Sequence, residues 1–184
     1  MKKILIAIIL SLSPFAFGST GRRPPTRLSY GKIEVAKQII THLKKKHPKE
    51  NAVHIVALGL VESGLTNAVN RSGDYGYLQV NCHIWSRRLQ KVHGVSNCAH
   101  DMLTLHRNVD AAVYILQRFR RYKACKGDNL YACYNGGQRW VPSGAACLKR
   151  CKNKCRSCTR PARHASTVRR HINFLRRRYA HLFN

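Results

Sequence analysis

The sequence predicts a mainly α-helical fold that carries a cysteine-rich basic insertion near its C-terminus. Apolar residues recur at helical spacing in several segments, and no segment shows the sustained alternation that indicates a β-strand. One of these segments, residues 52–63, is apolar nearly all round, as in a helix at the centre of a domain. With 184 residues the chain is long enough for one domain with a substantial core, which we assign to residues 31–184.

The helical segments follow one another along the chain. Before Pro48, a first helix places on one face the residues Ala36, Ile39, Ile40 and Leu43. Asn51 is a suitable N-cap for the second helix, residues 52–63. A third helix is expected near 101–122 and a last one near 165–183, with the inward-facing residues Val109, Ala112, Val113, Leu116 and Phe119, and Val168, Ile172, Leu175, Tyr179 and Leu182. Between the second and third helices, residues 66–76 are turn-rich and hold either a short hairpin or a loop.

Residues 1–18 have the pattern of a signal peptide. Two lysines open the segment, residues 4–12 form an apolar run, and a small-x-small cleavage signal ends at Gly18. Because no apolar stretch reaches the roughly 20 residues that span a bilayer, no transmembrane anchor is expected after cleavage. We therefore expect a secreted or periplasmic protein that begins with a flexible basic lead-in over residues 19–30.

The charge balance indicates an anionic partner. Lys and Arg number 34 against 7 Asp and Glu, so the formal net charge is +27. Nucleic acid, phospholipid and a cell-wall polymer all attract such a chain, but export and the lack of aromatic residues among the basic clusters argue against nucleic acid. The insertion at 138–164 combines Gly, Pro, Cys and Arg with no acidic residue. We expect this insertion to hold the protein on the wall and to take no part in the chemistry.

The eight cysteines indicate disulfides, because export takes the chain to an oxidising compartment. Cys82 with Cys98 and Cys125 with Cys133 are suitable local pairs. The last four, Cys147, Cys151, Cys155 and Cys158, form either disulfides or a zinc site. Export and the unusual spacing favour disulfides, so we expect no metal and no cofactor.

Glu62 stands out among the seven acidic residues because it ends the most apolar helix of the chain. Burial and the negative end of the helix dipole both disfavour its ionised form. A carboxylic acid that keeps its proton near neutral pH is what general-acid chemistry on a glycosidic oxygen requires. An exposed glutamate at a helix end is the alternative interpretation from position alone.

Three segments in order resemble the motifs of the soluble lytic transglycosylase family, which belongs to the lysozyme-like superfamily. They are 61–64 (VESG), 74–81 (DYGYLQVN) and 133–137 (CYNGG). The family pattern has a catalytic Glu-Ser at the end of a buried helix, a Gly-Leu-Met-Gln segment and an Ala-Tyr-Asn-Ala-Gly segment. The resemblance covers roughly 33–137 and 165–183 and implies a lysozyme-like fold. Tyr77 and Leu78 replace the commoner Leu-Met, Cys133 replaces Ala, and the cysteine-rich insertion has no counterpart.

The resemblance implies cleavage of the β-1,4 bond between N-acetylmuramic acid and N-acetylglucosamine in peptidoglycan. Glu62 would act first as acid and then as base, so that the muramic 6-hydroxyl closes onto C1 as a 1,6-anhydro product. Ser63 would orient the Glu62 carboxyl, and the sugar would be positioned by Gln79, Tyr134 and Asn135. The small single-domain chain, which we expect to be a monomer, is similar to family members that serve secretion or conjugation machinery.

Two alternatives stay open at this point. Asp74 lies in a segment that also resembles animal-type lysozymes, where it would be a second catalytic carboxylate for hydrolysis of the same bond. Asp74 is otherwise a turn residue. A protein that binds walls or membranes through its charge, without catalysis, is the other alternative, and the presence of Glu62, Gln79 and Tyr134 argues against it.

Overall fold

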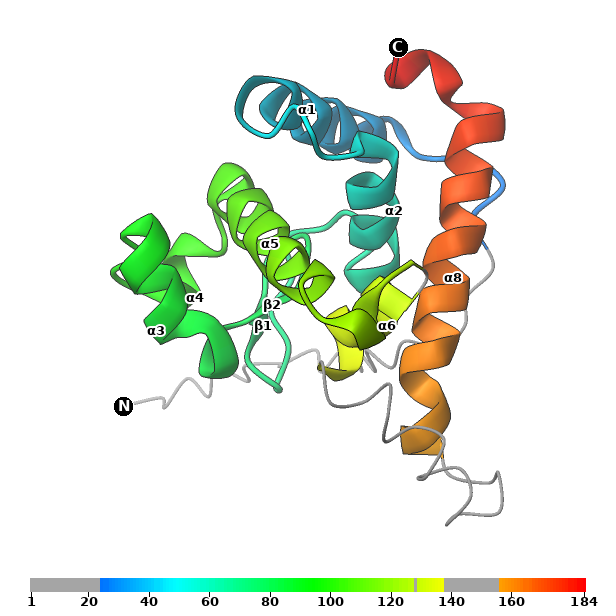
Figure 1. The fold of residues 1–184 in the computed structure, drawn as a ribbon. Helices are drawn as coiled ribbons and strands as arrows, with labels where there is room; N and C mark the ends of the chain where they lie inside the picture. The colour runs from blue at the N-terminus through cyan, green and yellow to red at the C-terminus, as the bar shows by residue number, and fades with distance from the viewer. Residues whose placement is uncertain (1–23, 128, 138–155) are drawn as a thin grey trace, which may run out of the picture.

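The computed structural model describes residues 24–127, 129–137 and 156–184, and it confirms the mainly α-helical fold (Figure 1). The elements in chain order are α1 (Tyr30–Lys46), α2 (Ala52–Glu62), β1 (Asp74–Tyr75), β2 (Val80–Asn81), α3 (Cys82–His93), α4 (Cys98–Asp101), α5 (Leu105–Arg120), the 3₁₀ turn η1 (Lys123–Cys125), α6 (Asn129–Gly136), α8 (Arg156–Arg178) and the 3₁₀ turn η2 (Ala180–Leu182). Within these residues, no helix has the length and apolar character that crossing a membrane would need.

The first two helices form as the sequence predicts. The four apolar residues expected on one face of α1 are all buried, and Asn51 caps α2 by accepting a hydrogen bond from the His54 amide. Residues 55–60 of α2 are all buried. Figure 1 shows the reason: α2 stands in the interior, with α1 across its start and α8 along its side. The C-terminal end of α2 is thereby held among other elements.

The turn-rich segment contains a hairpin, and a helix that the sequence analysis did not predict follows it. Strands β1 and β2 pair antiparallel, with Asp74 opposite Asn81. Asn81 then caps α3, because its side chain accepts a hydrogen bond from the Ile84 amide. Only Cys82, Trp85 and Leu89 of α3 are buried, so the helix has a narrow apolar face.

The third predicted helix is interrupted. Residues 98–101 form the single turn α4, and α5 begins only at Leu105. The Asp101 carboxylate accepts hydrogen bonds from the amides of Ser96 and Asn97, which closes α4 back on the preceding loop. The helix predicted near 101–122 is therefore wrong at its start, while its predicted inward residues are all buried in α5.

The last helix is longer than predicted. It begins at Arg156, inside the segment 138–164 assigned to the insertion, and Pro161 lies within it. Of the residues predicted to face inward, Val168, Ile172, Leu175 and Tyr179 are buried and Leu182 is partly buried. The helix packs against α2 and α6. The signal peptide at 1–18, the cysteines at 147, 151 and 155 and the Cys158 side chain lie outside the described residues, as do residues 138–155 of the insertion.

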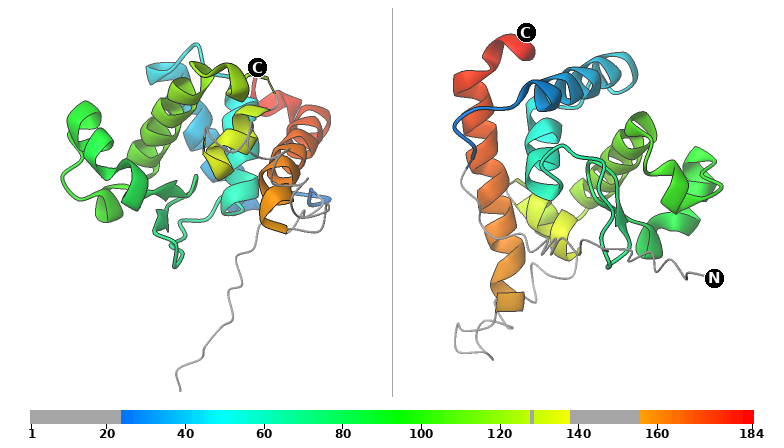
Figure 2. Two further views of the ribbon diagram at one scale, coloured as in Figure 1. Left: turned by 60° about the horizontal axis from the view of Figure 1, so that its bottom comes forward. Right: turned by 180° about the vertical axis from the view of Figure 1, so that it is seen from behind.

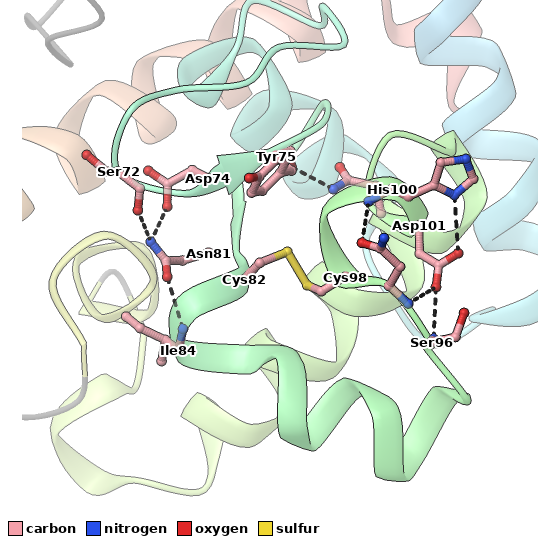
Figure 3. Close-up of a disulfide and its surroundings, with 12 residues drawn as sticks. Ser72, Asp74, Tyr75, Asn81, Cys82, Ile84, Ser96, Cys98, His100 and Asp101 are labelled. Atoms are coloured by element: carbon pink, nitrogen blue, oxygen red, sulfur yellow. Dashed lines mark hydrogen bonds and ion pairs between the residues drawn. A yellow bond between two sulfur atoms is a disulfide. The ribbon is translucent and has the colours of Figure 1, made fainter.

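Both of the local disulfides expected from the sequence are present. Cys82–Cys98 joins the start of α3 to the start of α4, beside the hairpin (Figure 3). Cys125–Cys133 joins η1 to α6. In Figures 1 and 2, α3 and α4 lie at one side of the molecule and α8 at the other. Between these two sides lie the hairpin, helix α6 and the C-terminal end of α2 (Figure 1). These three elements carry most of the site residues predicted from the sequence.

Candidate active site

Glu62 is the last residue of α2, and α8 brings a histidine against it. The His164 Nε2 atom lies 3.1 Å from Glu62 Oε1, and the exposed fractions of the two side chains are 0% and 12%. Neither ring nitrogen of His164 makes a hydrogen bond to a described residue, so the short approach is off the line of a hydrogen bond. A buried polar group left in this state costs about 1–3 kcal/mol. The sequence analysis missed His164 because it placed the residue in the basic insertion.

Ser63 ties the end of α2 to the hairpin. Its hydroxyl lies 2.7 Å from the Tyr77 carbonyl oxygen, to which it donates, and it accepts a hydrogen bond from the Thr66 amide. These partners are main-chain groups of the loop that follows α2 and of the hairpin turn. Ser63 therefore fixes the backbone next to Glu62, and its expected action on the Glu62 carboxyl stays a prediction.

Asn108 holds the other side of the hairpin turn, a role that the sequence analysis did not assign. The residue is fully buried on α5; its side chain accepts a hydrogen bond from the Leu78 amide and donates one to the Tyr75 carbonyl. Gly76 lies directly against it with a φ of +77°, and a Cβ atom there would collide with the Met102 carbonyl and the Asn108 amide. The close approach explains why only glycine fits at position 76.

Gln79 uses its amide within the protein. The side-chain nitrogen donates to the carbonyls of Ala68 and Gly76, and the oxygen accepts a hydrogen bond from Asn70. Gln79 also has a φ of +48°, a left-handed conformation that a non-glycine residue adopts only when its surroundings impose it. Its hydrogen bonds thus maintain the hairpin loop, and a direct contact with a sugar is not needed to explain them.

Asp74 is a strand residue, where the sequence also allowed a turn. Both carboxylate oxygens accept hydrogen bonds from side-chain amides, one from Asn70 and one from Asn81, each at 2.6 Å. Figure 3 shows Asn81 reaching from the opposite strand to Asp74 and to the Ser72 carbonyl. These two hydrogen bonds fix the orientation of the carboxylate within the hairpin.

Tyr134 connects α6 to this group. Its hydroxyl donates to the Leu78 carbonyl over 2.8 Å. Burial raises the pKa of Tyr134 well above its ordinary value, and the negative charges of Glu62 and Asp74 raise it further. The carboxylates of Glu62, at the end of α2, and of Asp74, in β1, therefore both lie close enough to influence this hydroxyl. Asn135 follows on α6 and is partly exposed.

A second group of side chains has the donor types of a metal site. His42, His47 and Asp110 bring three ligand atoms within 4.8 Å of one another. Asp110 Oδ1 lies 2.6 Å from His42 Nε2 and 2.7 Å from His47 Nε2, and Oδ2 lies 3.4 Å from the Lys46 ammonium. A cation bound there would have to displace that ammonium, so we interpret the group as a charge network between α1 and α5.

Comparison with known protein families gives a match to the transglycosylase SLT domain over residues 39–146. No curated protein and no solved structure matches the chain. The matched region contains Glu62, the hairpin and Tyr134, and it ends before α8 and His164. Because the match covers more than half of the chain, this protein belongs to the transglycosylase SLT family, the lysozyme-like family of peptidoglycan lytic transglycosylases.

Proposed function

We propose that the protein is an exported lytic transglycosylase that cleaves the β-1,4 bond between N-acetylmuramic acid and N-acetylglucosamine, with Glu62 as acid and base. The observation that carries the proposal is the carboxyl at the end of the buried helix α2, whose side chain is only 12% exposed. The tethered hairpin and the Tyr134 hydroxyl form its surroundings. Such a group is largely shielded from bulk water, as suits a residue that exchanges a proton with a bound substrate.

The reaction needs one group that gives a proton and takes one back. The Glu62 carboxyl protonates the glycosidic oxygen as its bond to C1 of the muramic residue breaks. The carboxylate left behind then accepts the proton of the muramic 6-hydroxyl while that oxygen bonds to C1. The products are a 1,6-anhydro end and a new N-acetylglucosamine hydroxyl, and no water is consumed.

Lysozyme-type hydrolysis is the second candidate, and the hydrogen bonds of Asp74 are the observation in its favour. An ionised Asp74 near Tyr134 is suited to stabilise positive charge at C1, after which water attacks. Neutralising Asp74 in the Asp74→Asn variant then costs several kcal/mol in the barrier. In the transglycosylase the same variant loses less than about tenfold, since the 6-hydroxyl is the nucleophile.

Export and wall binding complete the proposal. The two disulfides support folding in an oxidising compartment, and the positive charge supports attraction to the anionic wall. We assign Asn135 to the sugar-binding side of α6 and Gln79 to maintenance of the loop. A secretion or conjugation machine that needs a local opening in the wall is the partner that we propose.

Mass spectrometry of digested peptidoglycan tests the proposal directly. Wild-type protein should yield 1,6-anhydro ends, Asp74→Asn should yield the same ends, and Glu62→Gln should yield no products. Reducing ends together with a large loss in Asp74→Asn would make the enzyme a hydrolase. Full wall cleavage by Glu62→Gln would contradict the assignment of the acid, and a protein that binds sacculi without any cleavage would favour the non-catalytic alternative.

A further inference from the structure

The buried ring of His164 is a polar group for which the packing of α8 gives no explanation. The buried residues near it on the helix include the apolar Ala165, Val168 and Ile172 and the polar Thr167. His171, two turns further along the same helix, is also buried, but its Nδ1 atom lies 2.9 Å from the Thr167 carbonyl and bonds to it. His164 has no such partner among the described residues and points at Glu62.

We propose that His164 is the positioning residue of Glu62, holding Oε1 through an Nε2–H hydrogen bond while Oε2 carries the transferred proton. The inference rests on the proposed function, because it assigns a partner to the same acid. The observed 3.1 Å separation lies within the range of a hydrogen bond, and the proposal requires the two side chains to turn until Oε1 lies along the Nε2–H direction. With Oε1 occupied, the remaining oxygen is the one that faces the glycosidic bond.

The hydrogen bond strengthens at the step where it is needed. While Glu62 is protonated, Nε2–H donates to a neutral carboxyl; once the proton has moved to the leaving oxygen, it donates to a carboxylate. Hydrogen bonds to charged acceptors are roughly twice as strong as neutral ones. His164 thus stabilises the transition state more than the resting enzyme, and this difference accelerates the reaction. The imidazole keeps its own proton throughout, and the proton from the 6-hydroxyl returns to Oε2.

The inference also explains why α8 is part of the catalytic unit. The family match ends at residue 146, whereas His164 is contributed by a helix that starts at Arg156. That helix packs along α2 and α6, the two elements that carry Glu62 and Tyr134. Figure 1 shows α8 running beside both of them, so its docking delivers the ring to the acid.

The test compares two buried histidines of one helix. In the full chain, with soluble glycan-strand fragments as substrate, His164→Leu should lower kcat about 10²-fold and change KM less than about threefold. His164→Gln, whose amide can donate to Oε1, should recover activity to within about tenfold of wild type. The matched control His171→Leu should change kcat less than about twofold, although it replaces an equally buried ring. Thermal melting of each variant shows whether it is folded.

Several outcomes would overturn the inference. If His164→Leu keeps kcat within threefold of wild type, or if His171→Leu loses as much kcat as His164→Leu, the ring does not act through Glu62. If His164→Leu fails to fold, His164→Gln against His164→Met decides, and equal activity of the two refutes the hydrogen bond. Glu62→Gln separates the two proposals: an active Glu62→Gln enzyme contradicts the proposed function, whereas an inactive one beside an active His164→Leu contradicts only this inference.

Discussion

Glu62 and Asp110 are two carboxylates with the same exposed fraction, 12%, and both face histidine rings. Asp110 accepts hydrogen bonds from His42 and His47 and also pairs with Lys46. Glu62 has one ring beside it, and that ring makes no hydrogen bond to a described residue. The two carboxylates are thus equally buried, but Asp110 is well supplied with hydrogen bonds and Glu62 is not.

The difference teaches what each site does with its charge. Burial alone would raise the pKa of Asp110, but hydrogen bonds from His42 and His47 and the charges of His42 and Lys46 hold it below its ordinary value of 3.8. In its ionised form, Asp110 thus connects α5 to α1 through these contacts. The Glu62 carboxyl has fewer hydrogen bonds to the described residues than the Asp110 carboxyl has. Its oxygens can therefore bond to a substrate. Four substitutions or conditions test this contrast.

The largest effect is expected for Glu62→Gln. Turnover of glycan fragments should fall by roughly 10²–10⁴-fold, since one positioned proton donor has this value. The melting temperature should stay equal or rise, because the change removes a carboxyl from a mostly buried position. Product formation by mass spectrometry and a thermal melt give the two readouts. Residual turnover above about 1% of wild type would show that another group supplies the proton.

Asp110→Asn should give the opposite result. Its free energy of unfolding should fall by about 2 kcal/mol, because hydrogen bonds to a charged group are lost or weakened. Turnover should remain within about threefold of wild type, since the network touches none of the residues around Glu62. Urea unfolding measures the first quantity, and the glycan assay measures the second. Unchanged stability would mean that the histidines find equally good partners without the carboxylate.

Acid should reveal the same network without mutation. Because the pKa of Asp110 is lowered in the folded protein, its stabilising contribution is full above about pH 4 and is lost as the pH falls through the folded pKa. Below about pH 4, wild-type stability should therefore fall more steeply than that of Asp110→Asn. Glu50, whose pKa is also lowered by its hydrogen bonds to Arg120 and Gln117 against the effect of burial, contributes equally in both proteins. Parallel pH–stability curves would contradict the prediction.

The smallest effect is expected for Lys46→Met. The Lys46 side chain is 63% exposed, and its ammonium lies 3.4 Å from Asp110, so water screens the pair. The free energy of unfolding should change by less than about 0.5 kcal/mol. Lys37→Met is the matched control, since Lys37 forms an exposed pair with Glu34 on the same helix. A loss close to that of Asp110→Asn would make the ammonium the main partner of the carboxylate.

Elements with a wide apolar face could be predicted from the sequence. The buried residues of α1 and α2 follow from the spacing of apolar residues, and the Asn51 cap follows from its residue type and position. The three motifs indicated the family, which the match over 39–146 confirms. Helix α3 was missed because few of its residues are buried. The break before α5 was missed because helical spacing did not distinguish the single turn α4 from the start of the longer helix.

Side-chain partners across the fold could not be predicted. Asn108 contacts a turn 30 residues away, and His164 meets Glu62 only because α8 packs against α2. Sequence motifs describe residues that are close along the chain, whereas these contacts join residues that only the packing of the fold brings together. The hydrogen bonds of the Gln79 amide within the hairpin loop are a further example, while its contact with the sugar stays a prediction.

The Cys125–Cys133 disulfide lies next to the residue that connects α6 to the hairpin. Tyr134 directly follows one of the two cysteines, and its hydroxyl is the link between α6 and the hairpin. In the reduced chain, α6 would be connected to η1 only by the main chain between them and by packing, and helices of this length have little stability of their own. We therefore expect the reduced protein to hold Tyr134 less firmly against the hairpin and to be less active than the oxidised protein. Under the proposed function, chains that are kept reduced would cleave peptidoglycan more slowly than chains that have reached an oxidising compartment.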